Sequence, residues 1–385
     1  MSLKVFILAG EPSGDRLGGA LMAGLKELRR DVAFDGIGGD LMEAQGLASR
    51  FPMQELSVMG LAEVLPKYRH LKRRIRETAE AVIAQQPDVL ITIDSPDFSL
   101  RVASMVKAGS NIRTVHYVAP SVWAWRPKRA VKMAKSIDQV LALLPFEPPL
   151  MEAAGMDCDF VGHPVVSEPL ATAAEIDSFR AQFDLGQAPL LLALPGSRRS
   201  EVTRLGPIFG EALQAFQHFH PEHRVVVPCA APVTDLVRAQ AEEWPEDTLF
   251  LDPKAYEAED FAAIKRAAFA ASDLALAASG TVSLELAAAA TPMVIAYRFQ
   301  WLTWQIMKRM ALIDTVTLVN LVSETRVVPE CLGPDCEAEM IAHELDALAK
   351  APELQKAAMA VTMQRLGLGG EAPGLRAARA VLNRL

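Results

Sequence analysis

The chain has 385 residues, of which 51% are apolar and 22% charged, and this length is sufficient for two or three domains with buried cores. The net charge of -8 argues against nucleic acid as a partner, because the chain as a whole does not neutralise a phosphate backbone. No long uninterrupted apolar stretch is present, which excludes a membrane-spanning helix.

Short apolar runs typical of buried strands alternate with longer segments of helical periodicity. This alternation predicts an α/β protein with parallel sheets. The expected strands of the first group are Lys4–Ala9, Val32–Ile37, Val89–Ile93, Arg113–Val118 and Gln139–Leu143. Those of the second group are Leu190–Leu194, Arg224–Pro228, Leu274–Ala277 and Met293–Ala296.

A segment rich in loop residues separates the two groups, so we place a linker near Pro164–Thr172. We expect domains over residues 1–168 and 169–350, with helices over 351–385 and no strand after about Tyr297. The acidity belongs to the second half: the chain through Val165 carries 20 Lys and Arg against 19 Asp and Glu, and the remainder carries 19 against 28.

The first apolar run is ended by Gly10 and Glu11, which makes it too short for a secretory signal and predicts a cytoplasmic protein. The four cysteines show no metal-ligand spacing, and we expect them to be reduced. They are Cys158, Cys229, Cys331 and Cys336. The acidic pair Asp157 and Asp159 precedes a strand-like run, which argues against a metal site for a sugar nucleotide. No metal is therefore expected.

Ligands of open parallel sheets bind beyond the carboxyl ends of the strands, so the loops that follow the strands are the candidate sites. The first, Ala9–Gly19, lacks both the GxGxxG pattern and the lysine of a P-loop. Ser13 or Asp15 can cap a helix predicted over Asp15–Leu28. Glu11 has no capping duty and is a candidate for chemistry.

The second loop places Asp94 and Asp97 after the run Val89–Ile93. Two carboxylates at this spacing can coordinate a metal, or one can act as a base that the other orients. The alternative is that Asp97 caps a helix from Phe98, which leaves Asp94 without a local structural role.

The third loop follows a strand that contains His116 and carries Trp123, Trp125 and Arg126. Aromatic and hydrogen-bonding groups of this kind can stack on a sugar or contact an acyl chain. A buried structural histidine is the alternative for His116.

Two further loops, in the second half, have the order strand, Gly with Ser or Thr, helix. They are Gly196, Ser197 and Arg198, and Ser279, Gly280 and Thr281. Backbone N–H groups at a helix start can bind a phosphate, and an arginine adds a bidentate charge, so the two loops together suit a pyrophosphate. Glu285 can accept hydrogen bonds from ribose hydroxyls. Capping alone explains either loop taken singly.

A basic segment containing Lys67, Arg69, Lys72, Arg73, Arg74 and Arg76 follows an apolar patch that includes Met59. It is either a solvated helix face or a surface that meets anionic lipid headgroups. A second candidate membrane contact is the aromatic segment 299–309, for which a core position is the alternative.

Ten motifs in order along the chain resemble those of the lipid-A-disaccharide synthase family. They are AGEPSGD, GIGGDLMEAQGL, SVMGLAEVLP, IDSPDF, HYVAPSVWAWRPKR, LALLPFE, FVGHP, LPGSRRSEV, SGTVSLELA and TLVNLV. The resemblance implies the glycosyltransferase B fold: two Rossmann-like parallel-sheet domains facing across a cleft, with the C-terminal helices 351–385 returning to the first domain.

The resemblance also implies transfer, with inversion, from UDP-2,3-diacylglucosamine to 2,3-diacylglucosamine 1-phosphate. The products are UDP and the β-1,6-linked disaccharide 1-phosphate of lipid A synthesis. UDP would bind in the second domain, where the resemblance adds Asn320 to the two Gly-Ser/Thr loops and Glu285. The first domain would bind the acceptor lipid; its expected contacts are Ser13, Met59, Asp97, Trp123, Trp125 and Arg126.

We expect Asp94 to be the general base, with Glu11 and His116 as the other candidates. Arg198 and the helix starts would stabilise the leaving pyrophosphate, so the expected mechanism needs no cofactor. The expected location is peripheral, on lipids of the inner face of the inner membrane, and a homodimer is left open. Two alternatives are a sugar-nucleotide-binding module without turnover and a sugar-nucleotide epimerase of the same fold.

Overall fold

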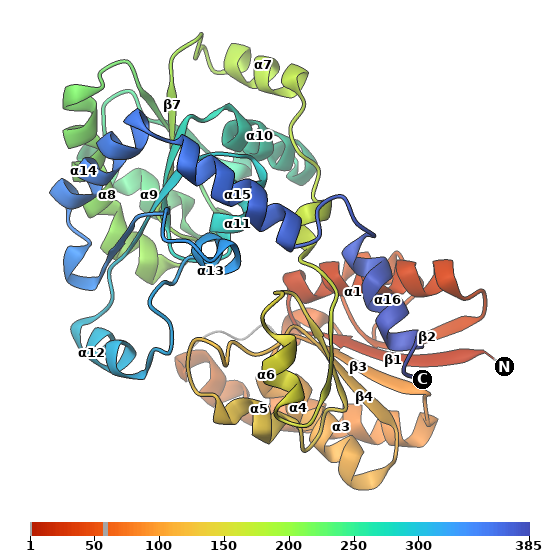
Figure 1. The fold of residues 1–385 in the computed structure, drawn as a ribbon. Helices are drawn as coiled ribbons and strands as arrows, with labels where there is room; N and C mark the ends of the chain where they lie inside the picture. The colour runs from red at the N-terminus through yellow and green to blue at the C-terminus, as the bar shows by residue number, and fades with distance from the viewer. Residues whose placement is uncertain (1, 57–60) are drawn as a thin grey trace. The chain divides into compact units, whose positions relative to one another are not determined.

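The computed structural model describes residues 2–56 and 61–385. The chain divides into two compact units, Met1–Ser167 with Leu366–Leu385, and Glu168–Arg365. Each unit is built on its own six-stranded parallel sheet, with helices on both faces (Figure 1). The predicted class, α/β with two Rossmann-like parallel sheets, is confirmed.

The sheet of unit 1 has the strand order β2-β1-β3-β4-β5-β6. Its strands are β1 (Leu3–Ala9), β2 (Val32–Ile37), β3 (Val89–Ile93), β4 (Arg113–Tyr117), β5 (Gln139–Ala142) and β6 (Asp157–Phe160). Its helices are α1 (Pro12–Leu28), α2 (Asp40–Glu43), α3 (Leu61–Gln85), α4 (Pro96–Gly109), α5 (Lys128–Met133), α6 (Pro148–Glu152) and α16 (Pro373–Leu382). Every residue of β3 is buried, as the continuous apolar run of a central parallel strand predicts.

The sheet of unit 2 has the order β12-β11-β10-β7-β8-β9. Its strands are β7 (Leu190–Leu194), β8 (Arg224–Pro228), β9 (Leu249–Leu251), β10 (Leu274–Ala278), β11 (Met293–Tyr297) and β12 (Glu330–Leu332). Its helices are α7 (Ala173–Gln182), α8 (Arg199–Phe219), α9 (Thr234–Ala239), α10 (Ala258–Ala271), α11 (Val282–Ala288), α12 (Trp301–Met310), α13 (Leu318–Ser323), α14 (Ala338–Lys350) and α15 (Glu353–Arg365).

All nine strands expected from the apolar runs are present, and three short edge or near-edge strands were not predicted: β6, β9 and β12. The expectation that strands stop at about Tyr297 is wrong, because β12 pairs with β11. Only Cys331 of β12 is fully buried, and Glu330 accepts the backbone N–H of Thr317 at 2.8 Å. A three-residue strand with one buried residue has no apolar run by which to recognise it.

The C-terminal segment 351–385 does not pack on the first domain as a whole. α15 belongs to unit 2, where the Thr362 hydroxyl lies 3.3 Å from the Val319 carbonyl of α13 and Arg365 donates to the Val322 carbonyl. Only α16 belongs to unit 1. Helical periodicity predicts a buried face, and it does not say which sheet that face covers.

α16 packs closely against α1 within unit 1, on the same face of the sheet (Figure 1). A Cβ atom at Gly24 would lie 2.8 Å from the Gly374 carbonyl oxygen, so the two helices approach with backbone in contact. The chain terminus is held by Arg384, which forms ion pairs with Asp157 and Asp159 of β6. The close packing of these glycines and the ion pairs of Arg384 hold α16 in unit 1.

Among the helices in the described part of the chain, none combines the length and apolar character needed to cross a bilayer.

Candidate functional site

Each sheet has a point at which successive connections leave in opposite directions. In unit 1 this point lies between β1 and β3, because β2 is on one side of β1 and β3 is on the other. In unit 2 it lies between β7 and β10. Ligands of open α/β sheets bind at such switch points, beyond the carboxyl ends of the strands. The loops after these four strands are therefore the candidate site in each unit.

The loops after β1 and β3 meet closely at Gly10 and Ser95. A Cβ at Gly10 would lie 2.6 Å from the Ser95 hydroxyl oxygen, so a larger residue here would displace the Ser95 side chain. Asp94 and Ser95 have φ values of 47° and 44°, in the left-handed region that residues with a side chain rarely adopt. Such strain costs about 1–3 kcal/mol a residue and clusters at functional sites.

The structure brings Asp94 and Glu11 to this same edge. Asp94 is half-buried, and its backbone N–H donates to the Tyr117 carbonyl of β4 at 3.0 Å. Glu11 is half-buried at the start of α1, in the loop after the neighbouring strand. Two carboxylates thus flank the switch point of unit 1.

His116 lies within β4 and is buried, with 2% of its surface exposed. Its Nδ1 lies 2.7 Å from the Thr92 hydroxyl of the adjacent strand. Burial lowers the pKa of His116 to about 4, so the imidazole is neutral at neutral pH. This geometry favours the structural alternative for His116 over a role at the open edge.

The capping interpretation of two acidic residues is wrong. α1 begins at Pro12 and α4 at Pro96, which places Asp15 and Asp97 inside the helices rather than before them. Asp97 is fully exposed, 4.0 Å from Arg101. Ser13 is exposed in the first turn of α1.

Asp15 caps a different helix from the one expected. Its carboxylate accepts the backbone N–H groups of Gly39 at 2.8 Å, Leu41 at 3.0 Å and Met42 at 3.1 Å. These are the orphan donors at the start of α2. Asp15 therefore fixes the loop after β2, and nothing local in the sequence predicts this partner.

The loop after β4 is held by Glu147, which sequence reasoning did not single out. The indole N–H of Trp123 donates to Glu147 Oε1 at 3.2 Å, and the Trp123 ring packs edge-to-face on Phe146. Glu147 Oε2 accepts the backbone N–H groups of Leu143 and Leu144. Burial nevertheless raises the pKa of Glu147 to about 7.

Trp125 and Arg126 form a stacked pair near the end of the same loop. The guanidinium carbon of Arg126 lies 4.2 Å from the centre of the Trp125 ring. Arg126 is exposed and Trp125 half-buried, so the loop presents an aromatic face and a cation to solvent. Met59, the remaining expected acceptor contact, lies outside the described residues.

In unit 2, the loop after β7 turns at Gly196, whose φ of 115° favours glycine. The backbone N–H groups of Ser197 and Arg198 donate to Glu201 Oε2 at 3.2 and 3.3 Å, and Arg198 Nη1 donates to Glu201 Oε1 at 3.0 Å. Glu201 thus occupies two donors that we expected to bind phosphate. What remains for an anion is the Arg198 guanidinium, whose side chain is 65% exposed.

Glu201 was also not singled out from the sequence, although its position gave a signal. A glutamate three residues after the residue that precedes a helix is the acidic half of a capping box. It holds Arg198 at the mouth of the loop.

The loop after β10 is open to solvent. Gly280 and Thr281 are exposed, and a Cβ at Gly280 would meet nothing within 4 Å. Since β7 and β10 are adjacent and parallel, this loop and the one at Arg198 lie at the same sheet edge. Ser279 is half-buried beside them.

Two expected nucleotide contacts have partners inside the protein. Glu285 on α11 is exposed and forms an ion pair with Lys265 Nζ at 2.7 Å. Asn320 is buried; its amide donates to the Thr315 hydroxyl and the Val328 carbonyl and accepts the Val328 N–H. Asn320 lies on α13, which packs against α11, the helix that follows the Ser279–Thr281 loop.

The acidic pair of β6 and part of the basic segment of α3 each form ion pairs with other residues of unit 1. Asp157 and Asp159 form ion pairs with Arg384, which gives them a structural role. On α3, Arg74 hydrogen-bonds to Glu55 and lowers the pKa of Glu55 to about 2. Arg74 is therefore engaged in an ion pair with Glu55, whereas the side chains of Arg69 and Arg76 are exposed to solvent.

Comparison with known proteins decides the family. Residues 5–380 match the family model described as lipid-A-disaccharide synthetase. A lipid-A-disaccharide synthase of Ruegeria pomeroyi is 69% identical over 383 residues, covering 100% of this chain and 96% of that protein. The chain belongs to the lipid-A-disaccharide synthase family. One from Rhodospirillum centenum is 45% identical, covering 99% of this chain and 94% of its own.

Membership makes the chain a glycosyltransferase of lipid A biosynthesis. Among solved structures, UDP-GlcNAc 2-epimerase from Neisseria meningitidis, bound to UDP-GlcNAc, matches with a TM-score of 0.61. The match covers 100% of this chain and 98% of that one at 12% identity, which shows the shared glycosyltransferase B fold and no more.

Proposed function

We propose that this lipid-A-disaccharide synthase family member joins UDP-2,3-diacylglucosamine to 2,3-diacylglucosamine 1-phosphate with inversion. The products are the β-1,6-linked disaccharide 1-phosphate and UDP. The observation that carries the proposal is the family match over nearly the whole chain, at 69% identity to a curated synthase. The chemistry at the two switch points supports it.

The donor is assigned to the switch point of unit 2. Arg198 is exposed and held by Glu201, and the Ser279–Thr281 loop beside it is open at Gly280 and exposes Thr281. A guanidinium and neutral donors are suited to a pyrophosphate whose negative charge grows as UDP departs. That a protein of the same fold is described as bound to UDP-GlcNAc is consistent with this assignment.

The acceptor is assigned to unit 1, with Asp94 as the general base. In a single displacement the acceptor hydroxyl attacks the anomeric carbon, its proton passes to the base, and UDP leaves with the electron pair of the broken bond. Asp94 is half-exposed at the end of a buried strand and is held in a strained backbone. Glu11 is the second candidate, and the buried, hydrogen-bonded His116 the weakest.

The lipid part of the acceptor is assigned to the surface around the loop after β4. The exposed Arg126 can meet a phosphate, and Trp125 offers an apolar face for a sugar ring or acyl chain. We also propose a peripheral location on the inner face of the inner membrane, supported by the exposed basic residues Arg69 and Arg76 of α3.

One incubation separates the proposal from its alternatives. The chain is incubated with the UDP-sugar alone, with the acceptor lipid alone, and with both, while UDP and lipid products are measured. We expect UDP release and a disaccharide only with both, and the proton NMR coupling at the new linkage should show the β configuration. A binding module would release no UDP, and an epimerase would convert the donor without acceptor; either result would overturn the proposal.

A further inference from the structure

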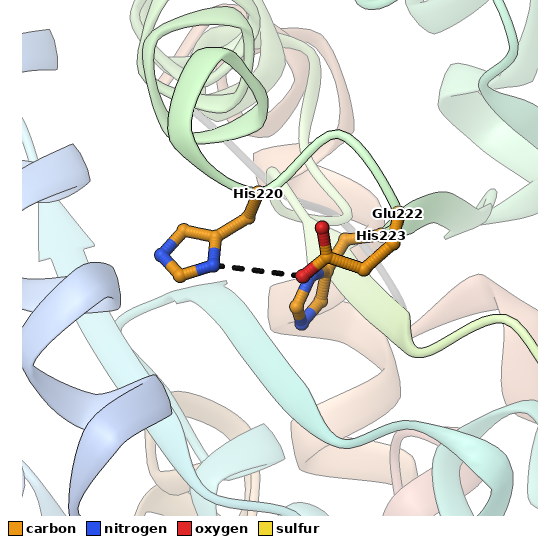
Figure 2. Close-up of side chains that lie close together, drawn as sticks. All are labelled: His220, Glu222 and His223. Carbon is orange, nitrogen blue, oxygen red and sulfur yellow. Dashed lines mark ion pairs between the residues drawn. The ribbon is translucent and has the colours of Figure 1, made fainter.

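The turn between α8 and β8 brings three potential metal ligands together. Figure 2 shows the side chains of His220, Glu222 and His223 converging from this turn. His220 directly follows α8, and His223 directly precedes β8. The backbone is fixed at both ends, because the His223 N–H donates to the His220 carbonyl at 3.1 Å and the Arg224 N–H to the Pro189 carbonyl at 2.9 Å.

The spacing of the three groups is close to that of a metal site. Glu222 Oε1 lies 3.2 Å from His223 Nδ1 and 3.7 Å from His220 Nδ1, and all three ligand atoms lie within 4.8 Å of one another. Ligands about 2.0–2.1 Å from a tetrahedral zinc ion are about 3.3 Å from each other. The two Glu222–histidine separations are therefore already near tetrahedral values, and the remaining adjustment falls on the separation of the two imidazoles.

His223 supplies an independent indication of a ligand. Its side chain is only 10% exposed, and its buried Nδ1 makes no hydrogen bond although Glu222 Oε1 faces it at 3.2 Å. A buried nitrogen without a partner is costly, and each such atom in a native protein calls for an explanation. Coordination of a cation between Nδ1 and the facing Glu222 carboxylate would satisfy it.

His220 is oriented by a carboxylate on its other side. Its Nε2 lies 2.9 Å from Asp346 Oδ1 on α14, and Asp346 Oδ2 is held by Lys350 Nζ at 2.6 Å. A proton on Nε2 that is donated to Asp346 leaves the Nδ1 lone pair facing Glu222. Metal-bound histidines almost always donate their other ring N–H to a carboxylate, a backbone carbonyl or water, and Asp346 supplies the first of these.

We propose that this turn binds one divalent transition-metal ion of the zinc type, through Nδ1 of His220, Nδ1 of His223 and the Glu222 carboxylate. Two imidazoles and one carboxylate suit zinc, whereas magnesium and calcium prefer oxygen ligands alone.

The metal site lies far from the proposed chemistry. The 21 residues of α8 separate it from Arg198 by about 30 Å at 1.5 Å a residue. Its role is structural: through Asp346 it fixes the end of α8 against α14, which packs on the same face of the sheet. This inference does not depend on the identity of the donor or the acceptor.

The test is titration of zinc chloride into the untagged full chain after removal of metal with a chelator, followed by calorimetry and thermal unfolding. We expect one saturable equivalent and a rise in Tm. Cobalt(II) at the same site should give the intense visible absorption of a tetrahedral ion. The absence of saturable binding, or a six-coordinate cobalt spectrum, would overturn the proposal.

Variants distinguish this site from adventitious binding elsewhere. His223→Ala should abolish binding, and Glu222→Gln, at an exposed position that does not endanger folding, should weaken it at least tenfold. Asp346→Asn should weaken it by about 10–100-fold. His218→Gln is the matched control, since His218 is exposed near the end of the same helix. If Glu222→Gln and Asp346→Asn bind zinc as tightly as the parent chain, the assignment is wrong.

Discussion

The two switch points share a topology and differ in chemistry. At β1 and β3 the loops carry carboxylates, Glu11 and Asp94, and at β7 and β10 they carry Arg198 with hydroxyl groups. Parallel sheets decide where a ligand can bind, because strand ends and helix starts meet at one edge. The loop residues decide whether that edge accepts a proton or holds an anion.

The residues that adopt positive φ also differ between the two edges. The turn after β7 reaches positive φ at Gly196, where no side chain opposes it, whereas the turn after β3 does so at Asp94 and Ser95. A side chain is kept at a strained position only when its chemistry or contacts outweigh the strain. This difference favours Asp94 as a functional residue.

The largest expected effect is a loss of activity at the carboxylate edge, that is, the loops after β1 and β3 that carry Glu11 and Asp94. Asp94→Asn should lower kcat by about 10²–10⁴-fold, because the amide cannot take the proton of the acceptor hydroxyl. The measurement is the steady-state rate of UDP release with both lipids. Glu80→Gln, at an exposed position of α3 in the same unit, is the control and should stay near the parent rate. If Asp94→Asn keeps more than about a tenth of the rate, Glu11→Gln becomes the decisive variant.

The loops after β7 and β10 form the edge that we expect to bind the anion. Here Arg198→Ala should lower kcat/KM by about 10²–10³-fold, because the leaving pyrophosphate loses a stabilising charge. Glu201→Gln should have a smaller effect in the same direction, since it loosens Arg198 without removing it. UDP inhibition constants measured alongside should rise in both variants. Arg204→Ala, at a half-buried position of α8 whose side chain donates to the Ser200 carbonyl, is the control, and equal losses at Arg204 and Arg198 would contradict the assignment.

A pH-dependent difference in stability is expected at Glu147, the residue that holds the tryptophan loop. Its pKa is about 7 in the folded chain and 4.5 ordinarily, so its contribution is fully present below about pH 4.5 and is lost as the pH rises through 7. Relative to Glu147→Gln, the parent chain should lose about 3 kcal/mol of unfolding free energy between these limits. Urea unfolding at pH 5 and pH 8 measures most of this.

The exposed Glu152→Gln on α6 serves as the matched control for Glu147 and should follow the parent chain at both pH values. A stability difference between the parent and Glu147→Gln that does not change with pH would mean that burial does not raise the pKa of Glu147.

The smallest expected effect concerns stability at the carboxylate edge. Asp15→Ala leaves three backbone N–H groups at the start of α2 without their acceptor and should cost about 2 kcal/mol in urea unfolding. Ser13→Ala, exposed two residues earlier, should change stability by less than about 0.5 kcal/mol. A loss of kcat without a loss of stability in Asp15→Ala would instead place Asp15 in the chemistry.

Much of the fold was predictable because central parallel strands are buried on both faces and read as continuous apolar runs. The runs Val89–Ile93 and Leu190–Leu194 are examples. Short strands such as β12 were missed because one buried residue makes no pattern. The candidate loops were found by the same logic, since they follow the strands.

The partners within those loops were not predictable. Glu147 to Trp123, and Asp15 to the start of α2, join residues 24 or more positions apart, and no local periodicity encodes such a pair. Asn320, which the family resemblance implies as a nucleotide contact, has hydrogen bonds to Thr315 and Val328 that the sequence also did not predict.

The sequence by itself determined the α/β class, the two groups of strands, the loops at their ends and the family, because hydrophobic periodicity and motif order are local properties of the chain. Only the tertiary structure decided which polar groups remain available for a ligand. Burial and hydrogen bonding join distant residues, as they do when His220 pairs with Asp346 and when the Asp15 carboxylate takes up the N–H groups of Gly39 and Met42.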